Sequence, residues 1–149
     1  MTKGYSIEQN KLNQKITSKV LGKNLPISRK YSVEVGRNIK GINLKKARDL
    51  LKNSIEKKKA IRFTKYKKSA GHRLGGIIGR YPVNVCKSFD NLLNTLEKNA
   101  IDKGLDEKKL IIKYVFVAKA FKFTRRRKTS LNNHKRKNVS VSIIGEEKN

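Results

Sequence analysis

The sequence predicts an α+β fold: three helices on one face of a small antiparallel three-stranded sheet, with a long extended β-hairpin projecting from it. Apolar residues recur at helical spacing in three segments, and two later segments have the composition of strands. Between those strands, residues 119–137 hold nine Lys or Arg and no Asp or Glu, which no small core could bury. This pattern of helices and strands is typical of a layered α+β domain.

The chain is expected to begin with an arm and a strand. Residues 1–17 are polar and rich in lysine, as in a basic N-terminal arm, and Ser18–Leu25 is predicted to form a short strand. Residues 1–149 as a whole are expected to make a single domain, since this length is ordinary for one core.

A first helix is predicted after Ser28, an N-cap candidate. Apolar residues follow it at i, i+4 and i+8, namely Tyr31, Val35 and Ile39. The same stretch also permits a strand, through the alternation of Ile27, Tyr31, Val33 and Val35, and the sequence leaves both readings open. Gly41 would end the helix.

Two more helices carry clearer stripes. Asn43 is the N-cap candidate of the second, whose apolar face comprises Leu44, Ala47, Leu51 and Ile55. Pro82 opens the third, which Gly104 would stop. The apolar face of the third helix comprises Val85, Phe89, Leu92, Leu96 and Ala100. Between these helices, Ala60–Gly79 shows no periodicity and predicts a loop of about 20 residues, a length usually tied to function or disorder.

The last third predicts two strands joined by the basic segment. Lys109–Phe123 is one strand, and Val139–Ile144 alternates apolar residues with Ser140 and Ser142, as in a half-buried strand. If the two strands pair, residues from about 114 to 143 form an extended hairpin. Arms of about 15 residues at ~3.3 Å each would make it ~50 Å long.

Composition restricts the function. Lys and Arg number 38 against 11 Asp and Glu, a formal net charge of +27. Such a charge repels itself in a compact monomer and attracts phosphates in a salt-sensitive manner. The single cysteine, Cys86, excludes an internal disulfide and a multi-cysteine zinc site. No apolar run approaches the ~20 residues of a membrane span, and no secretory signal is evident, so we expect a cytoplasmic protein with no membrane partner.

The sequence gives little support for a catalytic function. Residues 71–76 (GHRLGG) begin like a phosphate-binding loop, but Ile77 and Ile78 stand where Lys and Ser or Thr are needed. His72 and His134 have no carboxylate nearby in sequence to orient them. Cys86 falls on or beside an apolar helix face, which favours a buried small hydrophobe over a nucleophile. We therefore expect no enzyme, cofactor, metal or small-molecule substrate.

Two basic segments predict contact with RNA. Residues 57–80 hold nine Lys or Arg and no acid, interleaved with aromatic residues that can stack on unpaired bases. The RNA-binding candidates here are Arg62, Lys65, Tyr66, Lys67, Lys68, His72, Arg73, Arg80 and Tyr81. Those of the hairpin are Lys119, Lys122, Arg125, Arg126, Arg127, Lys128, His134, Lys135, Arg136 and Lys137.

Several blocks resemble a known family. They are LPISRKYS (25–32) with RNIKG (37–41), FTKYKKSAGHR (63–73) with GRYPV (79–83), and KNAIDKGLD (98–106). In order and content they resemble the large-subunit ribosomal protein L22 family of the archaeal and eukaryotic type (L17 in eukaryotic naming). Arg29 and Lys30, in the first block, complete the set of expected RNA-binding residues.

The resemblance implies a structural, non-enzymatic component of the large ribosomal subunit. It implies an α+β body near the exit of the polypeptide tunnel and a hairpin in the tunnel wall that contacts several rRNA domains. Its partners would be large-subunit rRNA, neighbouring ribosomal proteins and the nascent polypeptide. The alternative is a chromatin-type protein that compacts nucleic acid, which shares the charge but usually needs a basic recognition helix that is missing here. An RNA-modifying enzyme would need an acid–base constellation that the sequence lacks.

Overall fold

The computed structural model describes residues 16–73, 77–121, 124–127 and 130–148, and within 125–127 and 130–135 the backbone alone. Three strands form the main sheet: β1 (Thr17–Leu25), β8 (Val139–Glu147) and β5 (Leu110–Lys119). They are antiparallel in the order β1-β8-β5. The predicted strand at 18–25 is thus confirmed, and Thr17, assigned above to the arm, is its first residue. Of the rest of the arm, residues 1–15 lie outside the described residues.

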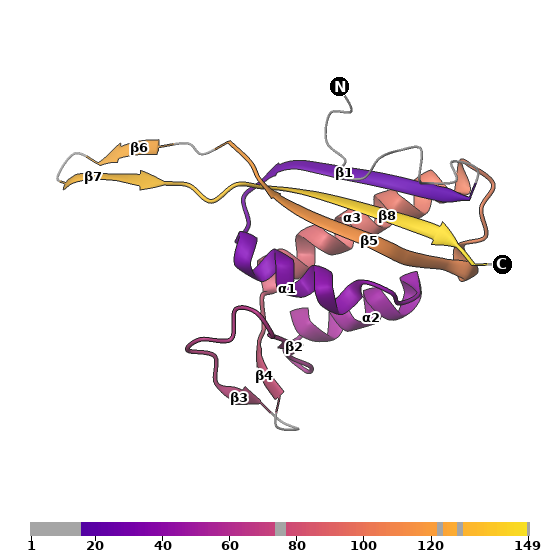
Figure 1. Cartoon of the computed structure of the whole chain (residues 1–149), viewed down its shortest axis with the longest axis horizontal. Coiled ribbons are helices and arrows are strands. Elements are labelled where there is room, and N and C mark those ends of the chain that lie inside the picture. The colour runs from indigo at the N-terminus through magenta and orange to yellow at the C-terminus, as the bar shows by residue number, and fades with distance from the viewer. Residues whose placement is uncertain (1–15, 74–76, 122–123, 128–129, 149) are drawn as a thin grey trace.

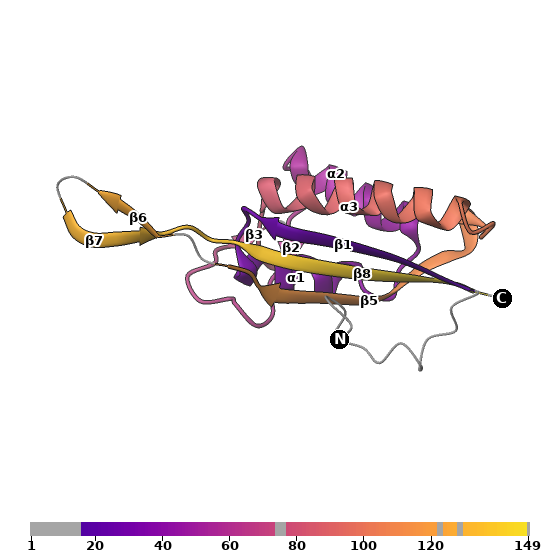
Figure 2. The same cartoon turned by 90° about the horizontal axis from the view of Figure 1, so that it is seen from above.

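Three helices pack on one face of this sheet: α1 (Arg29–Ile39), α2 (Leu44–Ile55) and α3 (Val83–Ile101) (Figures 1 and 2). A Cβ on Gly36 of α1 would lie 2.9 Å from Val115, and one on Gly22 of β1 would lie 2.8 Å from Leu92 of α3. The register places Val115 and Gly22 on the same sheet face, so α1 and α3 share that face. The core lies between these helices and the sheet.

The helix stripes are confirmed. Segment 29–39 is a helix rather than a strand, because Val35 and Ile39 both point into the core and are fully buried. Asn43 caps α2 through its Oδ1, which accepts from the backbone N–H of Lys45 (3.0 Å). Ser28 stands at the N-cap of α1, but its side chain makes no capping hydrogen bond. All five residues of the α3 stripe are buried.

Segment 60–79 is not the structureless loop that its sequence indicated. It contains β2 (Ile61–Arg62), β3 (His72–Arg73) and the start of β4 (Ile77–Arg80), which form a second sheet in the order β2-β4-β3. Two of these strands have two residues each, too short to leave a periodic pattern. The described residues therefore form two three-stranded antiparallel sheets where the sequence predicted one.

The long strand expected at 109–123 is shorter. Lys109 ends a 3-10 turn (Glu107–Lys109), and β5 stops at Lys119, where the apolar residues that face the helices run out. Beyond it, β6 (Thr124–Arg127) and β7 (Ser130–Lys135) pair as a separate antiparallel unit that projects past the main sheet (Figure 1). The described backbone thus has two paired units in place of one uninterrupted hairpin.

Strand β8 is more buried than its alternation indicated. Ser142 and Ile144, on the face away from the helices, are 3% and 0% exposed. The reason is its central position, because Phe116 and Leu21 flank Ser142 from the two neighbouring strands. An alternating pattern cannot distinguish a central strand from an edge strand.

Candidate nucleic-acid interface

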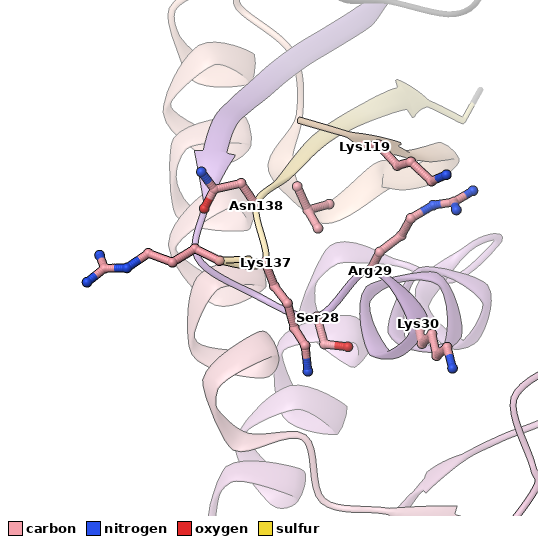
Figure 3. A pocket seen from close by; sticks show the side chains of 8 residues that line it. Ser28, Arg29, Lys30, Lys119, Lys137 and Asn138 are labelled. Carbon is pink, nitrogen blue, oxygen red and sulfur yellow. The ribbon is translucent and has the colours of Figure 1, made fainter. Parts of the chain in front are cut away.

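Five of the predicted cations line one cavity, the root pocket, at the place where β6 and β7 leave the body. It has a volume of about 400 Å³ and lies between the start of α1, the end of β5 and the chain leading into β8 (Figure 3). Its lining comprises Ser28, Arg29, Lys30, Lys119, Arg136, Lys137, Asn138 and Val139. In the view of Figure 3, the Arg29 and Lys119 side chains extend to the same side.

The register of the main sheet brings these segments together. Val139 opens β8 and pairs with Leu25 at the end of β1 on one side and with Lys119 at the end of β5 on the other. The chain after Leu25 turns directly into α1, and Lys137 lies two residues before Val139. Three segments far apart in sequence therefore meet at one end of the sheet.

The electrostatics of the root pocket favour an anion. None of the described residues that line it is acidic, and its five cations are exposed. The first turn of α1 has no acidic residue and no side-chain cap from Ser28, so the partial positive charge of the helix end faces this region uncompensated. Like charges gathered in this way repel one another in the free protein, and a polyanion would remove that repulsion.

A second cavity, the tyrosine pocket, adjoins the first and shares Ser28 with it. Its volume is about 360 Å³, and its lining comprises Pro26, Ile27, Ser28, Tyr31, Tyr81, Pro82, Val83, Asn84 and Val85. Arginines hold both tyrosines. The Arg80 guanidinium lies 5.7 Å from the Tyr31 ring centroid and donates to the Tyr31 hydroxyl (2.8 Å), and that of Arg73 lies 5.3 Å from the Tyr81 ring centroid. Phe63 packs edge-on against Tyr31.

A buried carboxylate anchors the basic segment that follows β2. Glu34 of α1 is fully buried, and its Oε1 accepts from the backbone N–H groups of Lys65 (2.8 Å) and Tyr66 (2.7 Å). Its Oε2 accepts from the N–H of Thr64 (3.0 Å). Burial raises the pKa of Glu34, but these backbone hydrogen bonds outweigh it, and the net shift of the pKa is downward.

Two neighbours on α1 extend this anchor. The Asn38 Nδ2 donates to the backbone carbonyl of Arg62 (2.8 Å), and the Arg37 Nη1 donates to the Thr64 hydroxyl (2.9 Å). Glu34, Arg37 and Asn38 were not among the functional residues expected from the sequence. The sequence did contain a signal for Glu34, because an acid three residues after Tyr31 lies on the apolar face of the helix. A carboxylate is stable there only if hydrogen bonds compensate its burial.

The anchored segment exposes several of the predicted RNA-binding cations. Lys65, Lys67 and Lys68 are exposed on the segment that Glu34 holds, as are Arg62, His72 and Arg73. Tyr66 is half-buried, with the Nζ atoms of Lys30 and Lys65 at 6.0 and 5.9 Å from its ring centroid. Lys30 thus belongs to the root pocket and also reaches the anchored segment. Arg80 is directed into the protein, because its second nitrogen donates to the Ser69 carbonyl (2.6 Å).

Five more predicted residues lie on the extension, as we call the projecting unit of β6 and β7. Arg125, Arg126 and Arg127 belong to β6, and His134 and Lys135 to β7, where only the backbone is described. Lys122 and Lys128 lie outside the described residues. Within the described part of the chain, no three His, Cys, Asp or Glu residues are grouped so as to hold a metal ion, and no helix there is long and apolar enough to cross a bilayer. Cys86 is buried as expected, and burial raises the pKa of its thiol.

The fold and this surface define a class: a small, polycationic α+β protein with a cluster of five cations at one end of its main sheet. The chain matches the model of the ribosomal protein L22p/L17e family over residues 20–144. It belongs to that family, which confirms the resemblance drawn from the sequence blocks.

Archaeal relatives support this family membership. The large ribosomal subunit protein uL22 of Archaeoglobus fulgidus is 42% identical over 98 residues, which cover 64% of this chain and 63% of the relative. The protein of the same name from Methanocaldococcus jannaschii is 35% identical over 76% of this chain and 75% of its own. That of Methanococcus aeolicus is 33% identical over 92% of this chain and 97% of its own.

Proposed function

We propose that this chain is a structural component of the large ribosomal subunit that binds ribosomal RNA and bridges several of its domains. The root pocket is the observation that carries the proposal, because five cations from three separate segments surround it without a lining acid. Such a site suits a polyanion that folds closely around the protein. The relatives named as uL22 proteins support the same assignment.

The mechanism is scaffolding by neutralisation of charge. Folded RNA brings phosphates close together, and Lys and Arg side chains that replace diffuse counterions reduce their repulsion. The anchored segment after β2 and the root pocket contact RNA from the body, while β6 and β7 contact it beyond the main sheet. The extension becomes fully ordered only during assembly, when folding and binding are coupled.

We propose the position of the chain within the ribosome from its resemblance to the L22 family. The body, a single domain whose basic arm precedes β1, sits near the exit of the polypeptide tunnel in the cytoplasmic ribosome. The extension lines the tunnel wall, where the nascent polypeptide passes it, and other large-subunit proteins adjoin the body. In this role the chain is a scaffold and not an enzyme.

Sedimentation tests the proposal. A cell lysate containing the tagged chain is run through a high-salt sucrose gradient, and the fractions are probed for the tag. We expect the chain to migrate with the large subunit and to leave it only when the RNA is unfolded. Migration with chromatin would instead support the nucleic-acid-compacting alternative, and recovery as free protein would overturn the ribosomal assignment.

A further inference from the structure

The two pockets beside Ser28 have complementary chemistry. The root pocket is cationic, and the tyrosine pocket is lined by aromatic, prolyl and aliphatic side chains, with Asn84 as its exposed polar group. They share Ser28, so a ligand that spans them would present an anion to one and a flat, largely uncharged group to the other. Neither pocket alone specifies such a ligand.

We propose that the two pockets together hold one RNA nucleotide turned out of its helix, with its phosphate in the root pocket and its base in the tyrosine pocket. This inference rests on the proposed function and specifies what this part of the surface binds. Extruded bases are commonly recognised by stacking on aromatic side chains, with polar groups at the base edge. Tyr31 and Tyr81 supply the rings, and Asn84 supplies an amide that can both donate and accept.

The walls of the tyrosine pocket are held before any ligand arrives. Phe63 packs on Tyr31 with ring centroids 5.4 Å apart, and Arg80 donates to its hydroxyl. Arg73 lies against the Tyr81 ring. A preformed pocket loses little conformational entropy on binding, which favours a rigid planar group such as a base over a flexible chain.

The experiment compares two RNA duplexes that differ in one nucleotide. One carries a single bulged adenosine and the other is fully paired, and equilibrium affinity for the full chain is measured at moderate salt. We expect the wild-type chain to bind the bulged duplex roughly tenfold more tightly, in line with the strength of base–aromatic stacking. This ratio tests the proposal without any variant.

Three variants then locate the effect. Tyr81→Leu removes one ring and is expected to bring the ratio of the two affinities close to one. Tyr81→Phe keeps the ring and should keep the preference. Tyr114→Leu, the matched control on the sheet face away from the helices, should also keep it.

The outcomes separate this proposal from the broader one. Equal wild-type affinity for the two duplexes would overturn the nucleotide pocket, and the tyrosine pocket would then be open to a side chain of a neighbouring protein. A preference that survives Tyr81→Leu would overturn it too. Failure to bind either duplex would overturn the proposed RNA-binding function itself.

Discussion

Glu34 illustrates how one residue positions a whole binding segment. A carboxylate with no exposed surface is costly unless its oxygens are satisfied, and here backbone N–H groups of three successive residues satisfy them. These hydrogen bonds give local order to a chain segment that is rich in lysine. Without an acid at this point, the repulsion among Lys65, Lys67 and Lys68 would drive the segment apart.

We predict that Glu34→Gln destabilises the protein by about 2–3 kcal/mol, because an amide presents a donor to backbone donors where a charged acceptor stood. Urea unfolding at neutral pH measures this. Glu56→Gln is the control, since Glu56 is an exposed acid in a surface ion pair with Lys58, and its substitution should not change stability measurably. Equal effects of the two substitutions would contradict the anchoring role.

The lowered pKa of Glu34 adds a pH dependence to this stability. Because the carboxyl binds its proton less readily in the folded than in the unfolded state, its contribution is present above its ordinary value of 4.5 and is lost as pH falls through the folded pKa. Urea unfolding over a range of acidic pH should therefore show a smaller acid-induced loss in Glu34→Gln than in the wild type. Parallel curves of stability against pH for the two proteins would refute the role given to the Glu34 carboxylate.

The cations of the root pocket should act through phosphate contacts. Removing one contact lowers the slope of log affinity against log salt by roughly 0.7 on a single strand. We predict such a decrease for Arg29→Gln and for Lys137→Gln, measured with an oligouridylate over a salt series. Lys87→Gln and Lys98→Gln, exposed on α3, are the controls and should leave the slope nearly unchanged.

At the scale of elements, the close approach of β2 and β4 decides whether the small sheet forms. Gly79 of β4 pairs with Arg62, and a Cβ on it would lie 2.6 Å from the Ile61 carbonyl oxygen. That oxygen is backbone and cannot turn aside, so the strands must separate. Gly79 also comes two residues before Tyr81, so the element that packs against Ile61 leads directly into the tyrosine pocket.

We predict that Gly79→Ala destabilises the protein by about 1–3 kcal/mol, the usual cost of overpacking, and weakens RNA binding. Gly71→Ala is the matched control, because a Cβ there meets nothing within 4 Å. Thermal unfolding and RNA affinity of both variants provide the measurement. If Gly79→Ala left both the melting temperature and the RNA affinity unchanged, the strands could separate without cost.

At the scale of the whole molecule, the net charge of +27 opposes folding and promotes binding. We predict that salt affects these two properties in opposite directions. Added chloride should raise the melting temperature of the free chain by screening self-repulsion, and it should lower RNA affinity by competing for counterion sites. The thermal unfolding is repeated in sulfate at equal ionic strength. Sulfate also stabilises proteins because it is excluded from their surface, so the comparison with chloride separates that effect from charge screening.

Local patterns in the sequence predicted the second and third helices, the strands of the main sheet and the family, whereas residues 29–39 also permitted a strand. Stripes such as Val85, Phe89 and Leu92 have only one way to bury their apolar face, so periodicity specifies them. The two acid-free segments were also visible, because charge composition needs no folding to be counted. Blocks such as GRYPV, residues 79–83, carried the family resemblance in their order along the chain.

How these parts come together as a site is a property of the three-dimensional fold. The root pocket exists because Leu25 and Lys119 both pair with Val139, and register between distant strands is a long-range property that no local pattern contains. The anchoring of residues 64–66 by Glu34 likewise joins segments about 30 positions apart. Local periodicity reports which face of an element is buried, whereas a binding site depends on which faces meet.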